Sequence, residues 1–225
     1  PTVGALTLPL TARGLWGSGW ATGDEGGSLY RDSTVSSDVA ATQTGINATL
    51  DGTSSITVAF FLAKGGGSAI PTAATIVRTG ATSDATAGWR VDSDFTANTS
   101  LRLTVGNGSS RQSLLASSAL ANDGAWRHYV AVIDREAGAL RLYVNGALAT
   151  SATLTLTGDF TSTGNVLDVL SMDQTNLDEL TIWNRALSSA DVAALYAARL
   201  SVLSTTAAGP TLEGIVRTGS DPGAV

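Results

Sequence analysis

Residues 122–146 read NDGAWRHYVAVIDREAGALRLYVNG, and this stretch decides the fold class of the chain. Its first half, residues 127–134, is dense in aromatic and β-branched side chains, which favour a β-strand. In its second half every second residue from 140 to 144 is aliphatic, and a period of two predicts a strand with one apolar face. The pair Asn145-Gly146 tolerates the positive φ angles of a type I′ turn, so a β-hairpin is predicted at this point.

Residues 177–200 read LDELTIWNRALSSADVAALYAARL, and their apolar period changes from that of a strand to that of a helix. Ser188 is followed three residues later by Asp191, a short version of the capping box that begins many helices. A short amphipathic helix over residues 189–199 is therefore predicted. Its apolar stripe includes Tyr196, which we interpret as a core residue because aromatic side chains at such positions usually bury.

Further candidate strands are separated by Gly, Asn, Asp and Ser, as in a sandwich of many short strands. They span residues 56–62, 75–79, 88–92, 101–105, 147–156, 166–170 and 179–183. The sequence therefore predicts an all-β fold, a jelly-roll sandwich of two antiparallel sheets with one short C-terminal helix.

Three short motifs resemble those of a known family. They comprise a strand motif with Asp123, Gly124, Trp126 and His128, a hairpin motif with Asn145 and Gly146, and a closing motif with Asp178, Glu179 and Arg185. Similar motifs occur in the laminin G-like domains of the concanavalin A-like lectin and glucanase superfamily. The resemblance extends from about residue 55 to residue 200. It implies a concanavalin A-like sandwich and a binding role.

The length of 225 residues suits one large β domain with a sizeable core. We expect residues 1–44 to form a Gly-rich arm with the first strands, and residues 45–200 to form the laminin G-like sandwich. Residues 201–225 contain Gly, Pro and Ser signals and are expected to form a linker-like tail.

Composition excludes several function classes. The net charge of −6 argues against a nucleic-acid partner, because phosphate binding needs clustered Lys and Arg. There is no cysteine, and hence no disulfide, thiolate metal site or cysteine nucleophile. No apolar stretch approaches the 18 or so residues of a membrane span.

Catalysis is not expected. Glycan-cleaving members of the superfamily that the chain resembles use paired carboxylates on one strand, and none of the four Glu residues lies in such a pattern. His128, the only histidine, lies within a predicted strand, and the sequence has no Gly-x-Ser-x-Gly motif to present a nucleophile. We interpret His128 as a satisfied, half-buried strand residue.

Aromatic and acidic residues provide the candidate binding sites of the chain. Trp16, Trp20 and Trp89 are the candidates for a sugar platform, while Trp126 and Trp183 are expected in the core. Trp16 and Trp20 are equally well explained as anchors in a subunit interface. Calcium sites occur in many domains of the family that the chain resembles, and the candidate ligands are Asp51 and Asp178.

Three functions are consistent with these observations. The first is a non-enzymatic, lectin-like binding module that recognises glycan or another surface polymer. The second is a structural phage capsid decoration or fibre protein whose arms lock onto neighbouring subunits, and the third is an accessory carbohydrate-binding domain of a secreted enzyme or adhesin. No signal peptide is visible, which favours a virion component or another protein of the extracellular surface.

Overall fold

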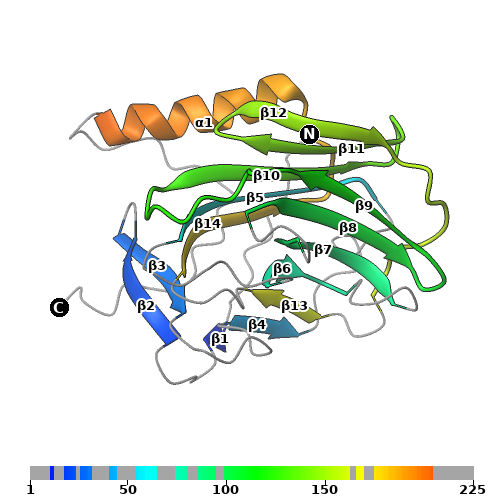
Figure 1. Ribbon diagram of the computed structural model, residues 1–225, viewed down its shortest axis with the longest axis horizontal. Coiled ribbons are helices and arrows are strands. Elements are labelled where there is room, and N and C mark those ends of the chain that lie inside the picture. The colour runs from blue at the N-terminus through cyan, green and yellow to red at the C-terminus, as the bar shows by residue number, and fades with distance from the viewer. Residues whose placement is uncertain are drawn as a thin grey trace.

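The computed structural model describes side chains for residues 54–64, 74–80, 86–94, 99–162, 166–169 and 175–198. For residues 11–12, 18–23, 26–31, 41–44 and 199–204 it describes the backbone alone. The described strands form two facing antiparallel sheets, with one helix outside them (Figure 1). The predicted all-β sandwich is confirmed.

The first sheet has the strand order β1-β4-β13-β6-β7-β8-β9. These strands are β1 (Thr11–Ala12), β4 (Ala41–Thr44), β13 (Val166–Val169), β6 (Thr75–Arg78), β7 (Ala87–Ser93), β8 (Leu101–Asn107) and β9 (Arg111–Ala116). The second sheet has the order β12-β11-β10-β5-β14-β3-β2. Its strands are β12 (Ala147–Thr153), β11 (Ala139–Val144), β10 (Arg127–Asp134), β5 (Ile56–Lys64), β14 (Thr175–Trp183), β3 (Gly26–Arg31) and β2 (Ser18–Gly23). The N-terminal segment thus contributes strands to both sheets.

The predicted hairpin between β11 and β12 is confirmed. Val144 pairs with Ala147, and the two turn residues have φ values of 49° for Asn145 and 79° for Gly146. Gly146 is required for a second reason, because a Cβ atom built on it would lie only 3.1 Å from the Tyr196 side chain. The turn therefore packs closely against the helix.

The main core lies between the two sheets. Its largest fully buried side chains include Phe60 and Tyr129 from the second sheet and Trp89 and Leu103 from the first. The rings of Phe60 and Tyr129 stack with centroids 5.7 Å apart. Because side chains alternate across a strand, these residues face inward while their neighbours face outward.

Helix α1 (Ser189–Ser204) begins at the predicted residue and ends five residues later than expected, at 204 rather than 199. The capping box is present. The Asp191 N–H donates to Ser188 Oγ at 3.1 Å, and the Ser188 N–H donates to Asp191 Oδ2 at 2.9 Å. This arrangement satisfies backbone donors that a helix N-terminus otherwise leaves free.

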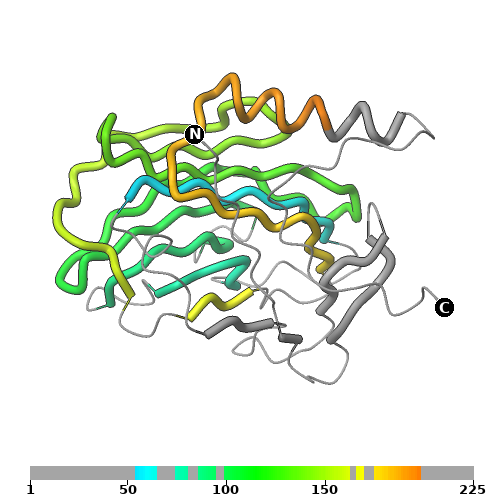
Figure 2. The backbone as a smooth tube through the Cα atoms, turned by 180° about the vertical axis from the view of Figure 1, so that it is seen from behind, coloured from blue at the N-terminus to red at the C-terminus, as the bar shows by residue number. Residues whose placement is uncertain are grey.

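The helix runs alongside β12 in both views of the chain (Figures 1 and 2), and its Val192 packs on the outer face of the second sheet. A second apolar cluster fills the space between them, formed by Ala59, Val130, Val132, Tyr143, Leu187 and Val192. Strand β5 is therefore buried along all nine residues, since one of its faces contacts the main core and the other contacts this cluster.

Strand β9 was not predicted, and β14 begins four residues earlier than expected, at 175 rather than 179. Strand β14 contains a bulge, because Asp178 pairs with Phe61 whereas Thr181 pairs with Ala59. Glu179 is the inserted residue and has a φ of 50°. The bulge therefore interrupts the alternation of side chains along β14 at this point.

Candidate functional site

Two adjoining hollows at one end of the second sheet form what we call the rim site. They lie where β10 turns into β11 and where β14 leads into α1. The polar hollow has a volume of about 740 Å³ and is lined by Ser54, Ser55, Asp134, Arg135, Glu136, Ala137, Arg141, Asn184, Arg185, Ala186, Leu187, Ser188 and Ser189. The apolar hollow, of about 310 Å³, is lined by Trp183, Arg185, Leu187, Asp191, Ala194, Leu195 and Ala198. Arg185 and Leu187 line both.

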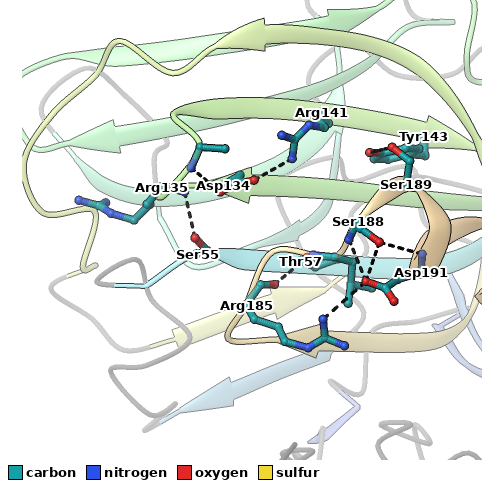
Figure 3. A network of polar contacts seen from close by, with 12 residues as sticks. Ser55, Thr57, Asp134, Arg135, Arg141, Tyr143, Arg185, Ser188, Ser189 and Asp191 are labelled. Carbon is teal, nitrogen blue, oxygen red and sulfur yellow. Dashed lines mark hydrogen bonds and ion pairs between the residues drawn. The ribbon is translucent and has the colours of Figure 1, made fainter.

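Thr57 fixes the segment that separates the two hollows (Figure 3). Its side chain is fully buried in β5. The Thr57 hydroxyl donates to the Arg185 carbonyl at 2.8 Å and accepts a hydrogen bond from the Leu187 N–H at 3.0 Å. A single hydroxyl thus satisfies two backbone groups and holds the shared wall against the sheet.

Asp134 and Arg141 form an ion pair across neighbouring strands on the wall of the polar hollow (Figure 3). An Nη atom of Arg141 lies 2.9 Å from Asp134 Oδ2, and the Ala137 N–H donates to Asp134 Oδ1 at 2.9 Å. Burial alone would raise the pKa of Asp134, but the Ala137 hydrogen bond and the Arg141 charge outweigh it and lower that pKa. The Asp134 carboxyl is therefore held in its ionised form.

Arg135 lines the same hollow, but its guanidinium group contacts residues outside the hollow lining, Gly158 and Phe160. Its backbone N–H donates to Ser55 Oγ at 2.9 Å. Its side chain donates to the Gly158 carbonyl at 2.6 Å, and the guanidinium lies 4.4 Å from the centre of the Phe160 ring. The Arg135 cation is thus engaged by a carbonyl and an aromatic face.

Arg185 and Asp191 stand where the two hollows meet. Their closest charged atoms are 3.7 Å apart. Asp191 Oδ2 also accepts hydrogen bonds from the N–H and hydroxyl of Ser188, each at 2.9 Å. These contacts, with a smaller contribution from Arg185, lower the pKa of Asp191. The Arg185 side chain remains 45% exposed.

Trp183 provides the aromatic surface of the apolar hollow. It is half-buried and packs against the cluster beneath α1. The sequence-based interpretation placed Trp183 in the core. The alternation of side chains along the strand would have predicted an outward-facing Trp183. Ile182 points into the main core, so its neighbour must point outward.

The predicted sugar platform does not assemble among the described side chains. Trp16, and the side chain of Trp20 in β2, lie outside the described residues. Trp89 is fully buried in the main core with 0% exposure. Its proposed binding role is corrected, because a ring enclosed between two sheets offers no face to a ligand.

Of the two predicted metal ligands, only Asp178 has a described side chain. Asp51 lies outside the described residues, and Asp178 is 8% exposed with Oδ1 accepting the Glu179 N–H at 2.8 Å. Among the residues with described side chains, no group of three or more His, Cys, Asp or Glu residues is positioned to hold a metal ion. Calcium binding stays a prediction.

The remaining motif residues have structural contacts. Asp123 accepts two hydrogen bonds of 2.7 Å from the Arg127 guanidinium, next to Gly124 with a φ of 75°. Asn145 Oδ1 accepts the His128 N–H at 3.0 Å. Trp126 is half-buried at the end of β10 opposite the rim site.

His128 is more deeply buried than expected. Its side chain is 4% exposed and lies between the rings of Phe61 and Tyr196. Its Nδ1 atom has no hydrogen-bond partner within the described ranges, so the expectation of a satisfied, half-buried histidine is corrected. Burial lowers the pKa of His128 to about 4.

Solved structures with a similar fold are binding domains of clostridial toxins. The binding domain of Paraclostridial Mosquitocidal Protein 1 has a TM-score of 0.63 and 16% identity, covering 84% of this chain and 47% of that chain. The botulinum neurotoxin serotype G binding domain has a TM-score of 0.57 and 16% identity, covering 86% and 50% respectively. The binding domain of botulinum neurotoxin DC in complex with SialylT has a TM-score of 0.51 and 16% identity, covering 88% and 47%.

This chain spans about half the length of those structures, and at such identity the likeness establishes the fold alone. A search among curated proteins yields no significant match. Within the described residues, no helix is both long and apolar enough to cross a membrane. A family profile described as the concanavalin A-like lectin/glucanases superfamily matches residues 33–193, which is more than half of the chain. The chain therefore belongs to the concanavalin A-like lectin and glucanase superfamily.

Proposed function

We propose that this protein is a non-enzymatic, lectin-like module that binds a glycan at the rim site. The observation that carries the proposal is the position of Trp183, half-exposed in an apolar hollow that adjoins a larger polar one. Both volumes are in the range of small-molecule binding sites. The similar solved structures are themselves described as binding domains, one of them in complex with SialylT.

The lining of the rim site matches the chemistry of a sugar. A pyranose ring has an apolar face that packs on an aromatic ring, and a perimeter of hydroxyls that both donate and accept hydrogen bonds. Trp183 offers the aromatic surface, while Asn184, Ser188 and Ser189 line the neighbouring hollow with amide and hydroxyl groups. Arg185 lies between the two and can donate to ligand oxygens.

Two of the three acidic residues of the rim site, Asp134 and Asp191, are unsuited to acid catalysis of glycan hydrolysis. Glycosidases need one carboxylic acid that stays protonated near neutral pH, which requires a raised pKa. Asp134 and Asp191 both have lowered pKa values, for the reasons given above. Neither of them is suited to protonate a leaving oxygen.

Glycan-array screening followed by calorimetry tests the proposal. We expect Trp183→Ala to weaken the affinity for the best glycan by at least about tenfold, roughly 1.4 kcal/mol, because the stacking surface is lost. Trp183→Phe should retain part of the affinity. Trp126→Ala is the matched control, since it removes another half-buried tryptophan from the opposite end of β10.

Equal binding by Trp183→Ala and the wild type would place the site elsewhere and refute the proposal. Hydrolysis of the bound glycan should stay at background. Repeating the glycan titration in the presence of a calcium chelator tests the calcium prediction, which requires the affinity to fall when calcium is removed. Two further predictions stay untested. One is the location of the protein on a virion or another extracellular surface, and the other is its assembly through the terminal segments.

A further inference from the structure

The charges that line the rim site balance. Three carboxylates line the two hollows, those of Asp134, Glu136 and Asp191, and they are matched by the three guanidinium groups of Arg135, Arg141 and Arg185. The formal charges of the site therefore sum to zero. A site that selects an anionic ligand normally has an excess of positive charge, which this one lacks.

The guanidinium groups are also individually engaged. Arg141 lies 2.9 Å from the Asp134 carboxylate, and Arg135 donates to the Gly158 carbonyl at 2.6 Å while lying over the Phe160 ring. The Arg185 side chain is 45% exposed, and it faces Asp191 at 3.7 Å. A ligand carboxylate that approached Arg185 would therefore meet the Asp191 charge as well.

This arrangement disfavours an acidic sugar and suits a neutral one. A ligand carboxylate next to Asp191 and Glu136 would experience like-charge repulsion, which reduces its affinity relative to an uncharged group. A pair of neighbouring hydroxyls faces no such cost. One hydroxyl can accept a hydrogen bond from Arg185 while the next donates one to Asp191, so that both members of the loose ion pair are used.

We infer that the rim site selects neutral glycans over acidic ones. In this arrangement a neutral hexose packs its apolar ring face on Trp183 and places adjacent hydroxyls between Arg185 and Asp191. This inference rests on the proposed glycan-binding function, and it adds the chemical class of the ligand.

Binding of glycan pairs that differ only in a carboxylate tests the inference. Suitable probes are polygalacturonate oligosaccharides and the neutral galactose oligosaccharides obtained from them by reducing each carboxyl group to a primary alcohol, titrated into the full chain. We expect at least about tenfold tighter binding of the neutral member, with little change between about 50 mM and about 500 mM NaCl because no ligand charge is screened. Tighter, salt-sensitive binding of the acidic member that still requires Trp183 would overturn the inference and leave the proposed function standing. If neither member of any such pair binds in a Trp183-dependent way, both proposals fail.

A charge variant gives an independent readout. Asp191→Asn removes the carboxylate beside Arg185 but keeps an oxygen that accepts hydrogen bonds from Ser188. We expect it to shift the neutral-to-acidic affinity ratio at least about fivefold toward the acidic glycan. Asp123→Asn changes the net charge of the protein equally, at the far end of β10, and should leave the ratio unchanged. An equal shift in both variants would mean that total charge, rather than the rim site, sets the preference, which contradicts the inference.

Discussion

His128 is a buried, ionisable residue whose protonation opposes folding. It lies 4.8 Å from the Phe61 ring and 6.0 Å from the Tyr196 ring, measured between ring centroids, and burial lowers its pKa from 6.5 to about 4. The unfolded chain therefore binds more protons than the folded one between these two pH values. The stability that neutral His128 provides is complete above pH 6.5 and is lost as the pH falls toward 4.

Urea unfolding measures this effect. Between about pH 7.5 and about pH 5, which stays above the range where most carboxylates titrate, we expect the free energy of unfolding to fall by about 2 kcal/mol. His128→Phe keeps an aromatic ring between Phe61 and Tyr196 but cannot be protonated, so its stability should change little over the same interval. A wild-type profile as flat as that of the variant would contradict the prediction.

The Thr57 hydroxyl is expected to contribute both to the stability of the fold and to the affinity for glycan. Thr57→Val conserves the side-chain volume but leaves the Arg185 carbonyl and the Leu187 N–H without their hydrogen bonds. Leaving buried backbone groups unsatisfied costs about 1 to 3 kcal/mol each, so we expect a stability loss of at least about 2 kcal/mol in thermal or urea unfolding. We expect glycan affinity to fall as well, because Arg185 is no longer held in place. Thr57→Ser should restore both quantities, and a fully stable Thr57→Val protein would refute this role.

At the scale of elements, the sequence predicted the strands and turns whose residues follow a regular apolar period or require an unusual backbone angle. Strand β10 was predicted with the observed bounds, and the turn at Asn145 and Gly146 was predicted because it requires positive φ angles that few residue types tolerate. Strand β9 begins with polar residues on the edge of a sheet, where only one face is covered, so its apolar signal is confined to its second half.

The bulge in β14 escaped prediction for a different reason. Leu177, Leu180 and Ile182 all belong to the main core, and this spacing fits a strand only if one residue is inserted between the first two. A spacing of three is ambiguous in a sequence, because it also fits a helix. The partner strand resolves the ambiguity, since the pairing with β5 continues on both sides of the insertion.

At the scale of the whole molecule, the rim site could not be predicted from local patterns. Its lining comes from residues 54–55, 134–141 and 183–198, which the strand order of the second sheet brings to one end. The sequence had singled out Arg185 as a motif residue, Ser188 and Asp191 as a capping box and Trp183 as a core residue, but none of them as part of a binding site. The aromatic candidates Trp16 and Trp20 were chosen for their Gly-rich surroundings, whereas the exposure of Trp183 depends on where β14 ends and α1 begins.

The amide side chain of Gln112 joins the two sheets at one margin of the sandwich. Gln112 lies in β9, the last strand of the first sheet, and contacts residues in and just after β12, the edge strand of the second. Its Nε2 donates to the Thr153 carbonyl at 2.6 Å, and its Oε1 accepts the N–H groups of Thr155 at 2.8 Å and Leu156 at 3.0 Å. Apolar packing in the core holds the two sheets face to face but has little directional preference. The hydrogen bonds of Gln112 are directional, so they fix the position of β12 relative to β9.

Replacing Gln112 therefore affects the margin more than the core. We expect Gln112→Ala to lower the free energy of unfolding by only about 1 to 2 kcal/mol, because the released groups are exposed and water replaces the lost hydrogen bonds. Hydrogen exchange at Thr155 and Leu156 should accelerate strongly, while the amides of β10 stay protected, since local opening at an edge leaves the central strands intact. Gln112→Glu separates the two halves of the contact: it keeps the acceptor for Thr155 and Leu156 and removes the donor to Thr153, so protection of those two amides should largely survive. Unchanged exchange in Gln112→Ala would show that packing alone aligns the two sheets.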